Sequence, residues 1–338
     1  MKERMKILKN RPIIKGFAAA VGKKEGEGPL KKWFDEIHDD TTLGEVSWEK
    51  AESSLQISAL TGALKKAGLK PVDMDYVLAG DLLNQCMGSS FGLREFGIPL
   101  IGLYGACSTM ALSLSLAAML VDSGYAAHAA AVTSSHFCSA ERQFRYPLEY
   151  GGQRPPSAQW TVTGAGSVVV SGEITANEAD KKLPHIYSVT HGKILDLGVK
   201  DANNMGAAMA PAAADTILAH LKCSGAKPDD YDLLLTGDLG SVGSELLHTL
   251  MKKEGVDIRG VHDDCGTRIF DLEGQDVHAG GSGCGCSASV LCGEILTKLS
   301  AGELSRVLFC ATGALMSTTS AQQGESIPGI AHAIEIRI

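Results

Sequence analysis

The amino-acid sequence predicts an α/β fold made of two related halves, in each of which helices cover a parallel or mixed sheet. The first observation is an internal repeat, because residues 68–82 and 225–239 are identical at nine of fifteen aligned positions. The second is that residues 107–135 and 285–313 share a pattern of apolar helix, glycine-containing turn and apolar strand. Strands that alternate with helices in this way are typical of sheets covered by helices.

The chain of 338 residues is about twice the usual length of one domain, which agrees with two core-forming units. We expect the halves to span residues 1–175 and 176–338 and to pack as one body. The boundary is placed in the polar stretch 173–183, which follows an apolar strand at 167–171. The first forty residues, with the charged, glycine-rich segment 22–28, are expected to form a surface loop before the first repeated helix.

Composition excludes several classes of protein. An apolar share of 44% argues against disorder, and 31 basic against 39 acidic residues offer no broad basic surface for nucleic acid. Nine cysteines, an odd number spread through a long chain, indicate a reducing compartment rather than a disulfide framework. Residues 1–12 lack the apolar region of a signal peptide, and the longest apolar stretch, 110–121, is too short to span a membrane. We therefore expect a soluble or peripheral protein.

The helix expected at Thr109–Val121 is apolar or small on nearly every side. A helix without a wide polar face is buried all round. Because the second half repeats this pattern after Gly285, the two helices are expected to form a middle layer between two sheets.

Cys107 lies in the turn Gly105–Ser108, between a strand pattern at 98–104 and this buried helix. Free backbone N–H groups and the helix dipole at such a position stabilise an anion and lower the pKa of a cysteine. The same donors could hold an oxyanion or a carboxylate. The alternative interpretation is a small residue buried for packing alone.

The turn, the buried helix and the duplicated halves resemble the thiolase and ketoacyl-synthase superfamily, in which a cysteine at this turn is the acyl nucleophile. The stretch 154–170, RPPSAQWTVTGAGSVVV, is similar to a superfamily segment that runs from Arg-Pro into a glycine-rich strand. The resemblance implies a thiolase-like duplicated fold with layers α-β-α-β-α and halves related by a pseudo-two-fold axis.

Seven shorter segments narrow the resemblance to the stage V sporulation protein AD family, over about residues 16–332. They are GDLLNQ at 80–85, TSSH at 133–136, AERQFRYP at 140–147, EYGG at 149–152, MAPAAAD at 209–215, HDDCG at 262–266 and AGGSGC at 279–284. That family is implied to bind dipicolinic acid (pyridine-2,6-dicarboxylate), with or without calcium, and to serve sporulation and germination by loading it into the developing spore. The resemblance also implies a homodimer, peripheral on the spore inner membrane or forespore membrane, that meets other membrane proteins of the stage V sporulation A operon.

Ketoacyl synthases supply two histidines from the second half, and this chain departs from that pattern. Cys265 stands where the first histidine is expected, with His262 three residues upstream, and His278 matches the second. The departure favours an inactive descendant that keeps its pocket as a ligand site. Two alternatives remain: an active acyltransferase that uses Cys107 on an acyl-coenzyme A thioester, and a purely structural subunit whose cleft is filled by side chains such as Phe137 or Trp160.

A pocket for a planar dianion needs a helix N-terminus, cationic or N–H donors and flat apolar walls. The candidate ligand-binding residues are Cys107, His136, Arg142, Arg145, His262, Cys265 and His278. The alternative for His136 is a structural role, and for the two arginines it is surface solvation. Asp81 and Asp238 occupy equivalent positions in the repeat, so we expect them to share a capping role.

A zinc site is not expected, although Cys284 and Cys286 could be combined with Cys265 and His262. The Cys-x-Cys spacing is shorter than the usual zinc knuckle. In the repeat, this segment coincides with the turn that carries Cys107, so backbone geometry accounts for its glycines. No cofactor is expected.

Overall fold

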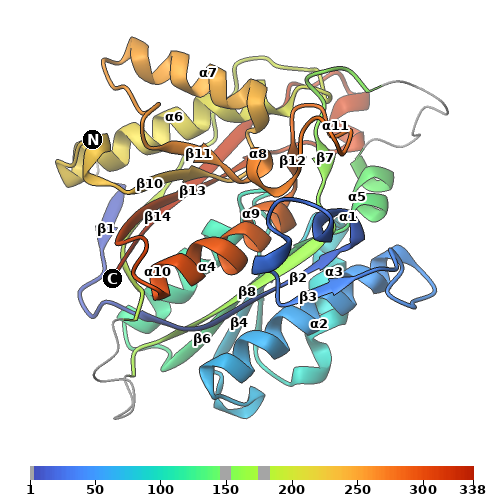
Figure 1. Cartoon of the computed structure of the whole chain (residues 1–338), viewed down its shortest axis with the longest axis vertical. Coiled ribbons are helices and arrows are strands. Elements are labelled where there is room, and N and C mark those ends of the chain that lie inside the picture. Colours follow the sequence, from blue (N-terminus) through green and yellow to red (C-terminus); the bar gives the residue numbers. More distant parts are fainter. Residues whose placement is uncertain (1–3, 145–153, 174–182) are drawn as a thin grey trace.

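The computed structural model describes residues 4–144, 154–173 and 183–338, and they form five layers (Figure 1). The strands are β1 (Met5–Ile7), β2 (Ile13–Gly22), β3 (Glu36–His38), β4 (Tyr76–Gly80), β5 (Leu100–Gly102), β6 (His128–Ser135), β7 (Trp160–Thr161), β8 (Gly164–Ser171), β9 (His185–His191), β10 (Leu233–Thr236), β11 (His262–Asp264), β12 (Gly281–Ser282), β13 (Arg306–Ala314) and β14 (Gly329–Arg337). The helices are α1 (Lys23–Gly26), α2 (Trp48–Ala67), α3 (Met87–Leu93), α4 (Thr109–Asp122), α5 (Phe137–Phe144), α6 (Met205–Ser224), α7 (Gly240–Lys253), α8 (Cys265–Ile269), α9 (Cys284–Val290), α10 (Leu296–Ser300) and α11 (Thr318–Gln322), with a π-helical turn at Leu291–Ile295 between α9 and α10.

Each half contributes a five-stranded mixed sheet. The order is β2-β8-β6-β4-β5 in the first half and β11-β10-β13-β14-β9 in the second, and one pairing, Ile13 of β2 with His185 of β9, joins the two. Within each of these orders two pairings are parallel and two are antiparallel. In addition, β3 pairs parallel with β2, and β1 pairs antiparallel with β9. The sequence-based prediction of two related α/β halves is therefore confirmed.

The middle layer is formed by α4 and by the continuous helical stretch α9–α10 (Figure 1). Helix α4 packs against β6 and β4 of the first sheet and against β13 and β14 of the second, and α9 packs against β8 and β6. Helix α2 covers the outer face of the first sheet, and α6 covers that of the second, with α7 packed against it. The prediction of two buried helices between sheets is confirmed, because apolar positions all round α4 require neighbours on both sides.

The identities in the repeat mark the same hydrogen bonds in both halves. After the outer helices end at left-handed glycines, Asp73 and Asp230 each accept a hydrogen bond from the backbone N–H of the lysine three residues earlier, at 2.7 and 2.8 Å. Asp75 accepts from two N–H groups at the start of β6, and Asp232 accepts from two at the start of β13. The repeated aspartates thus tie each outer helix and its strand to the neighbouring parallel strand.

The expectation of a surface loop over the first forty residues was wrong. Strand β2 lies at the centre, antiparallel to β8, and β1 pairs antiparallel with β9 of the second half. The sequence of β2, IIKGFAAAVG, does not alternate between apolar and polar residues, because both of its faces are largely covered. Segment 22–28 contains α1, whose Glu25 is buried. The boundary placed at 175/176 lies outside the described residues.

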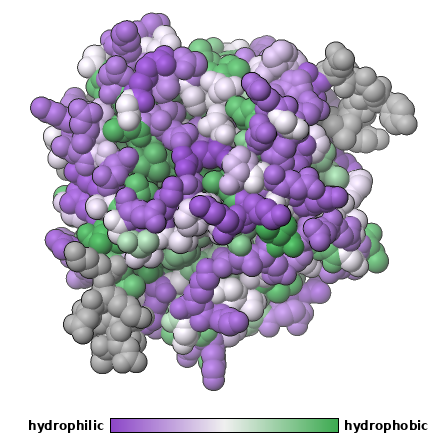
Figure 2. All heavy atoms as spheres, viewed as in Figure 1, coloured by the Kyte–Doolittle hydropathy of each residue, from purple (hydrophilic) through white to green (hydrophobic). Residues whose placement is uncertain are grey.

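The surface seen from the direction of Figure 1 is mostly hydrophilic, with small scattered apolar areas (Figure 2). Within the part of the chain that the structure describes, no helix is both long and apolar enough to cross a bilayer.

Candidate functional site

Cys107 lies between β5 and α4, as the sequence predicts, in a turn held by side chains of its own helix. The hydroxyl of Ser108 donates to the carbonyl of Gly105 and that of Thr109 donates to the carbonyl of Ala106, both at 2.6 Å. Ala106 adopts a φ of +49°, an uncommon conformation for a residue with a side chain. A Cβ on Gly313 of β13 would lie 2.4 Å from the Gly105 carbonyl oxygen. The second half therefore supports the turn directly, and a glycine makes the approach possible.

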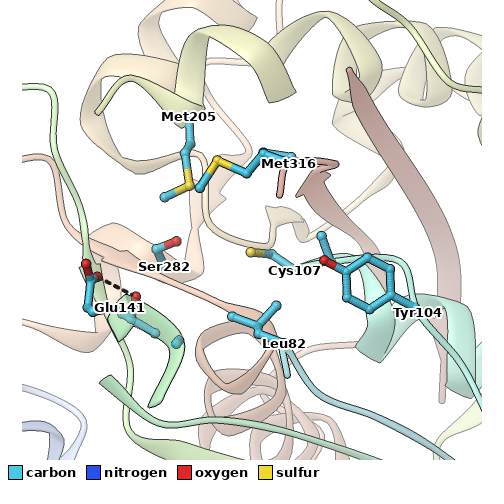
Figure 3. A pocket seen from close by; sticks show the side chains of 11 residues that line it. Leu82, Tyr104, Cys107, Glu141, Met205, Ser282 and Met316 are labelled. Carbon is cyan, nitrogen blue, oxygen red and sulfur yellow. Dashed lines mark hydrogen bonds between the residues drawn. The ribbon is translucent and has the colours of Figure 1, made fainter. Parts of the chain in front are cut away.

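The thiol of Cys107 points into a small cavity that opens toward the surface (Figure 3). Met205 and Met316 lie on one side, Leu82 lies opposite them, and Tyr104 closes one end (Figure 3). The described residues that line the cavity are Leu82, Tyr104, Ala106, Cys107, Ala140, Glu141, Thr161, Met205, Ser282, Ala314 and Met316. Both halves contribute, so the cavity lies where they meet.

The second half brings a carboxylic acid and a hydroxyl to Cys107. Asp238, which follows β10, is fully buried and accepts hydrogen bonds from the backbone N–H of Gly283 and the hydroxyl of Thr312, each at 2.9 Å. The hydroxyl of Ser282 donates to the same carboxylate at 3.4 Å. The Cys107 thiol also interacts with this carboxylate as a hydrogen-bond donor. Asp238 therefore lies directly behind the two polar groups that face the cavity.

Electrostatics keep Cys107 protonated. Burial raises the pKa of the Cys107 thiol well above its ordinary value, and the charge of Asp238 raises it further. Burial also raises the pKa of Asp238 to about 7. The expectation of a lowered pKa for Cys107 was wrong, because loss of hydration and a neighbouring carboxyl raise it. At neutral pH this cysteine is a hydrogen-bond donor rather than a ready nucleophile.

The structure places the three candidate histidines away from the cavity. Both ring nitrogens of His136 are engaged locally, Nε2 with the Thr41 carbonyl at 2.7 Å and Nδ1 with the Cys138 N–H at 3.2 Å. His262 lies on edge strand β11, with its Nδ1 2.8 Å from Nε2 of His248. His278 faces Asp276, at 3.1 Å. These three side chains therefore have structural partners and do not meet Cys107.

The remaining candidates also lie outside the cavity. Cys265 is fully buried at the start of α8, where burial raises the pKa of its thiol. Arg142 forms an ion pair with Glu49 and lines a surface groove. Arg145 lies outside the described residues. Of the seven candidates, Cys107 is the only one found in the described lining of the cavity.

The groove that Arg142 lines leads to the cavity. Tyr104 and Met316 line both the cavity and the next hollow, which continues past Asn84 and Thr318 to Arg142. Phe137 and Trp160, which could have filled the cleft, instead stack on each other with ring centroids 3.9 Å apart and do not line the cavity. The cavity beside Cys107 and the outer groove are therefore neighbouring hollows that share lining residues with the hollow between them.

Sequence reasoning missed Asp238 as a site residue because its repeat partner has another role. Asp81 caps the start of the following segment, accepting from the N–H groups of Leu83 and Ser89 at 2.8 and 2.7 Å. In the second half Asp264 takes that role, accepting from the N–H groups of Leu239 and Gly240. Asp238 is thereby free to face Cys107. The prediction of a shared capping role is confirmed for Asp81. Asp238 accepts from the N–H of Gly283, the residue that precedes α9, and in addition faces Cys107.

Glu141 and Ser282 were not among the candidate site residues, although both lie in segments that carried the family resemblance. Glu141 accepts a hydrogen bond from the hydroxyl of Thr161 at 3.0 Å, and it reaches the cavity from α5 (Figure 3). Ser282 arrives on the short strand β12, which pairs with β7. Among the residues that the structure describes, no group of three histidine, cysteine or acidic side chains is arranged to hold a metal ion.

Two duplicated α/β halves in five layers, with a cysteine at the N-terminus of a buried central helix, define the thiolase-like class of proteins. A 3-oxoacyl-[acyl-carrier-protein] synthase III from Aquifex aeolicus superposes with a TM-score of 0.58 and 14% identity, over 97% of this chain and 100% of that one. Cerulenin-bound OleA from Xanthomonas campestris superposes with a TM-score of 0.62 and 12% identity, over 98% and 100%. At these identities the likeness establishes the fold.

The sequence model of the stage V sporulation protein AD family matches residues 2–337, so the chain belongs to this family. The stage V sporulation protein AD of Bacillus subtilis (strain 168) is 47% identical over 325 residues, which is 95% of this chain and 93% of the relative. The resemblance stated from the sequence is confirmed, and the protein is a sporulation protein with a thiolase-like fold.

Proposed function

We propose that this protein binds dipicolinic acid in the cavity beside Cys107 and supports its uptake into the developing spore, without catalysing acyl transfer. The observation that carries the proposal is the surroundings of the thiol: burial and the Asp238 carboxyl raise its pKa, and the described lining of the cavity holds no histidine to act as its base. Family membership supports the choice of ligand.

The cavity suits a planar aromatic acid. Leu82, Met205 and Met316 supply apolar walls, and methionine sulfur packs favourably against aromatic rings. Tyr104, whose pKa is raised by burial, stays a hydroxyl donor at the cavity end. Together with Cys107 and Ser282 it offers protonated donors to the carboxylates of the ligand. A ring between apolar walls, with donors at its edge, is the arrangement we expect.

Calcium, if it accompanies the ligand, would arrive as part of it. Dipicolinate presents two carboxylates and a ring nitrogen to a cation, while the described residues offer no prepared metal cluster. Glu141 is the one carboxylate in the described lining, and carboxylate oxygen is a preferred ligand of calcium. A chelated calcium ion would also offset the negative charge of the ligand.

Calorimetry with dipicolinate tests the proposal. The wild type is expected to bind one molecule per chain, and Cys107→Ala to bind about tenfold more weakly, because a donor to a charged group is lost. Cys107→Ser, which keeps a donor, is the matched control and should lose less. Absence of binding by the wild type would refute the ligand, and unchanged binding by Cys107→Ala would remove Cys107 from the site.

The alternative is an acyltransferase, which the position of Cys107 at the head of α4 favours. An enzyme of that kind gains an acyl group on the thiol when it meets an acyl-coenzyme A. Because burial and Asp238 hold the thiol protonated, we expect mass spectrometry to find no such adduct. An adduct that Cys107→Ala abolishes would establish the enzyme instead.

We also propose that the protein works as a homodimer, peripheral on the spore inner membrane or forespore membrane, where it docks to other stage V sporulation A membrane proteins. Support for the dimer comes from β5, the last strand of the first sheet. Leu100 of this strand is 40% exposed, and Phe91 of the neighbouring helix α3 is 58% exposed. Uncovered edge strands with apolar neighbours tend to pair. Sedimentation should show a dimer that Leu100→Lys weakens; a wild-type monomer would contradict the proposal.

A further inference from the structure

Asp238 is a buried acid, and among the residues that the structure describes no cationic side chain is its partner. The titratable groups that face it are Cys107 from the head of α4, Cys284 and Cys286 from α9, Cys265 from α8, and Asp264 from the end of β11. All are thiols or carboxyls. The described lining of the cavity likewise contains no lysine, arginine or histidine. A carboxylate ligand in this cavity would therefore meet an ionised Asp238 without a compensating positive side chain from the described lining.

We propose that binding of a carboxylate ligand beside Cys107 is coupled to the uptake of one proton by Asp238, which makes this residue the positioning acid of the site. The inference rests on the proposed function, since it concerns the same cavity. The proton comes from solvent and ends on a carboxylate oxygen of Asp238.

The first physical reason is charge repulsion. Two carboxylates in a poorly hydrated space destabilise each other, and one of them takes up a proton when both cannot be solvated. The side chain of Asp238 has no exposed surface, so water cannot screen it from a ligand that touches Cys107 and Ser282. Protonation of Asp238 removes this repulsion.

The second reason is the direction of two hydrogen bonds. While Asp238 is ionised, the hydrogens of the Ser282 hydroxyl and the Cys107 thiol are directed to its carboxylate and are not available to a ligand in the cavity. Once Asp238 is neutral, its own O–H can donate to Ser282 Oγ, and the Ser282 hydrogen becomes available to the ligand. The same proton thus removes a negative charge and releases a donor.

The neighbouring groups do not compete for this proton near neutrality. Burial raises the pKa of Cys265, Cys284 and Cys286 well above their ordinary values, so these thiols are already protonated. The pKa of Asp264 is raised only to about 6, and four donors hold it as a carboxylate, whereas that of Asp238 is about 7. Above pH 7 Asp238 is therefore the acid that changes state on binding.

The test is calorimetry with dipicolinate, free of divalent cations, in buffers of different ionisation enthalpy. The heat difference between buffers reports the protons bound per ligand. We expect close to one at pH 8 and close to none at pH 6, with affinity about tenfold weaker for each pH unit above 7. Asp238→Asn, which is neutral at every pH, should bind with pH-independent affinity and take up no proton. Glu141→Gln, which changes the carboxyl inside the cavity, should keep the uptake.

The outcomes separate the two proposals. Binding without net proton uptake by the wild type overturns the coupling and leaves the ligand proposal standing, whereas absence of binding overturns both. Uptake that persists in Asp238→Asn and disappears in Glu141→Gln assigns the proton to Glu141 and contradicts the role of Asp238. The proton count and pH profile of the wild type decide the coupling even if a variant fails to fold.

Discussion

Replacing Ala314 with phenylalanine is expected to abolish dipicolinate binding, by more than about a hundredfold, while the fold persists. Ala314 ends β13 and lines the cavity, so a ring at this position occupies the space that the ligand needs. The strand is paired with β14 along its whole length and cannot move aside. Interiors this closely packed give a ligand no second place beside the ring. Calorimetry measures the loss, and circular dichroism reports the fold.

The matched control is Ala301→Phe, which adds the same ring at an exposed position just after α10. It should bind as the wild type does. If Ala314→Phe binds normally, the ligand does not occupy the cavity beside Cys107. If both variants lose binding, the effect comes from the added ring and not from the site.

Replacing Gly166 with alanine is expected to destabilise the protein by about 3 kcal/mol or more. Gly166 lies in β8, against α9 of the middle layer, where a Cβ would stand 2.5 Å from the carbonyl oxygen of Ala288 and 2.9 Å from its Cβ. These neighbours belong to a rigid helix, so the sheet and the helix must move apart. Denaturant-induced unfolding measures the change in free energy.

Gly260→Ala is the control, because a Cβ there meets no atom within 4 Å and the backbone conformation suits any residue. Its stability should match that of the wild type within about 0.5 kcal/mol. Equal stability of Gly166→Ala and the wild type would mean that the middle layer is less tightly packed than the structure describes.

The fold was predictable because the repeat reports contacts that both halves need. Asp75 and Asp232 are identical since each fixes the start of a parallel strand, and Gly68 and Gly225 are identical since each ends a helix in the left-handed conformation. The helix patterns add a separate signal, because α4 is apolar on all sides only if sheets lie on both. Strand β2 was missed since a strand covered on both faces shows no alternation.

The site was predictable only at Cys107, where a local pattern of strand, turn and helix places the side chain. The residues around Cys107 depend on how the two halves pack together, which the repeat does not report. Asp81 and Asp238 occupy equivalent positions in the repeat. In the second half, however, Asp264 accepts the capping hydrogen bonds, and Asp238 faces Cys107. His278, which the superfamily resemblance suggested, faces Asp276 and does not line the cavity. Nor does a sequence reveal that the Cys107 thiol is buried beside a carboxyl that raises its pKa.

A crystal structure of the protein with dipicolinate bound tests the central claim most directly. The ligand should lie between the side chains of Leu82, Met205 and Met316, with one carboxylate within hydrogen-bond distance of Cys107 Sγ and Ser282 Oγ. Density for the ligand only in the outer groove, near Arg142, with the cavity empty, would contradict the account.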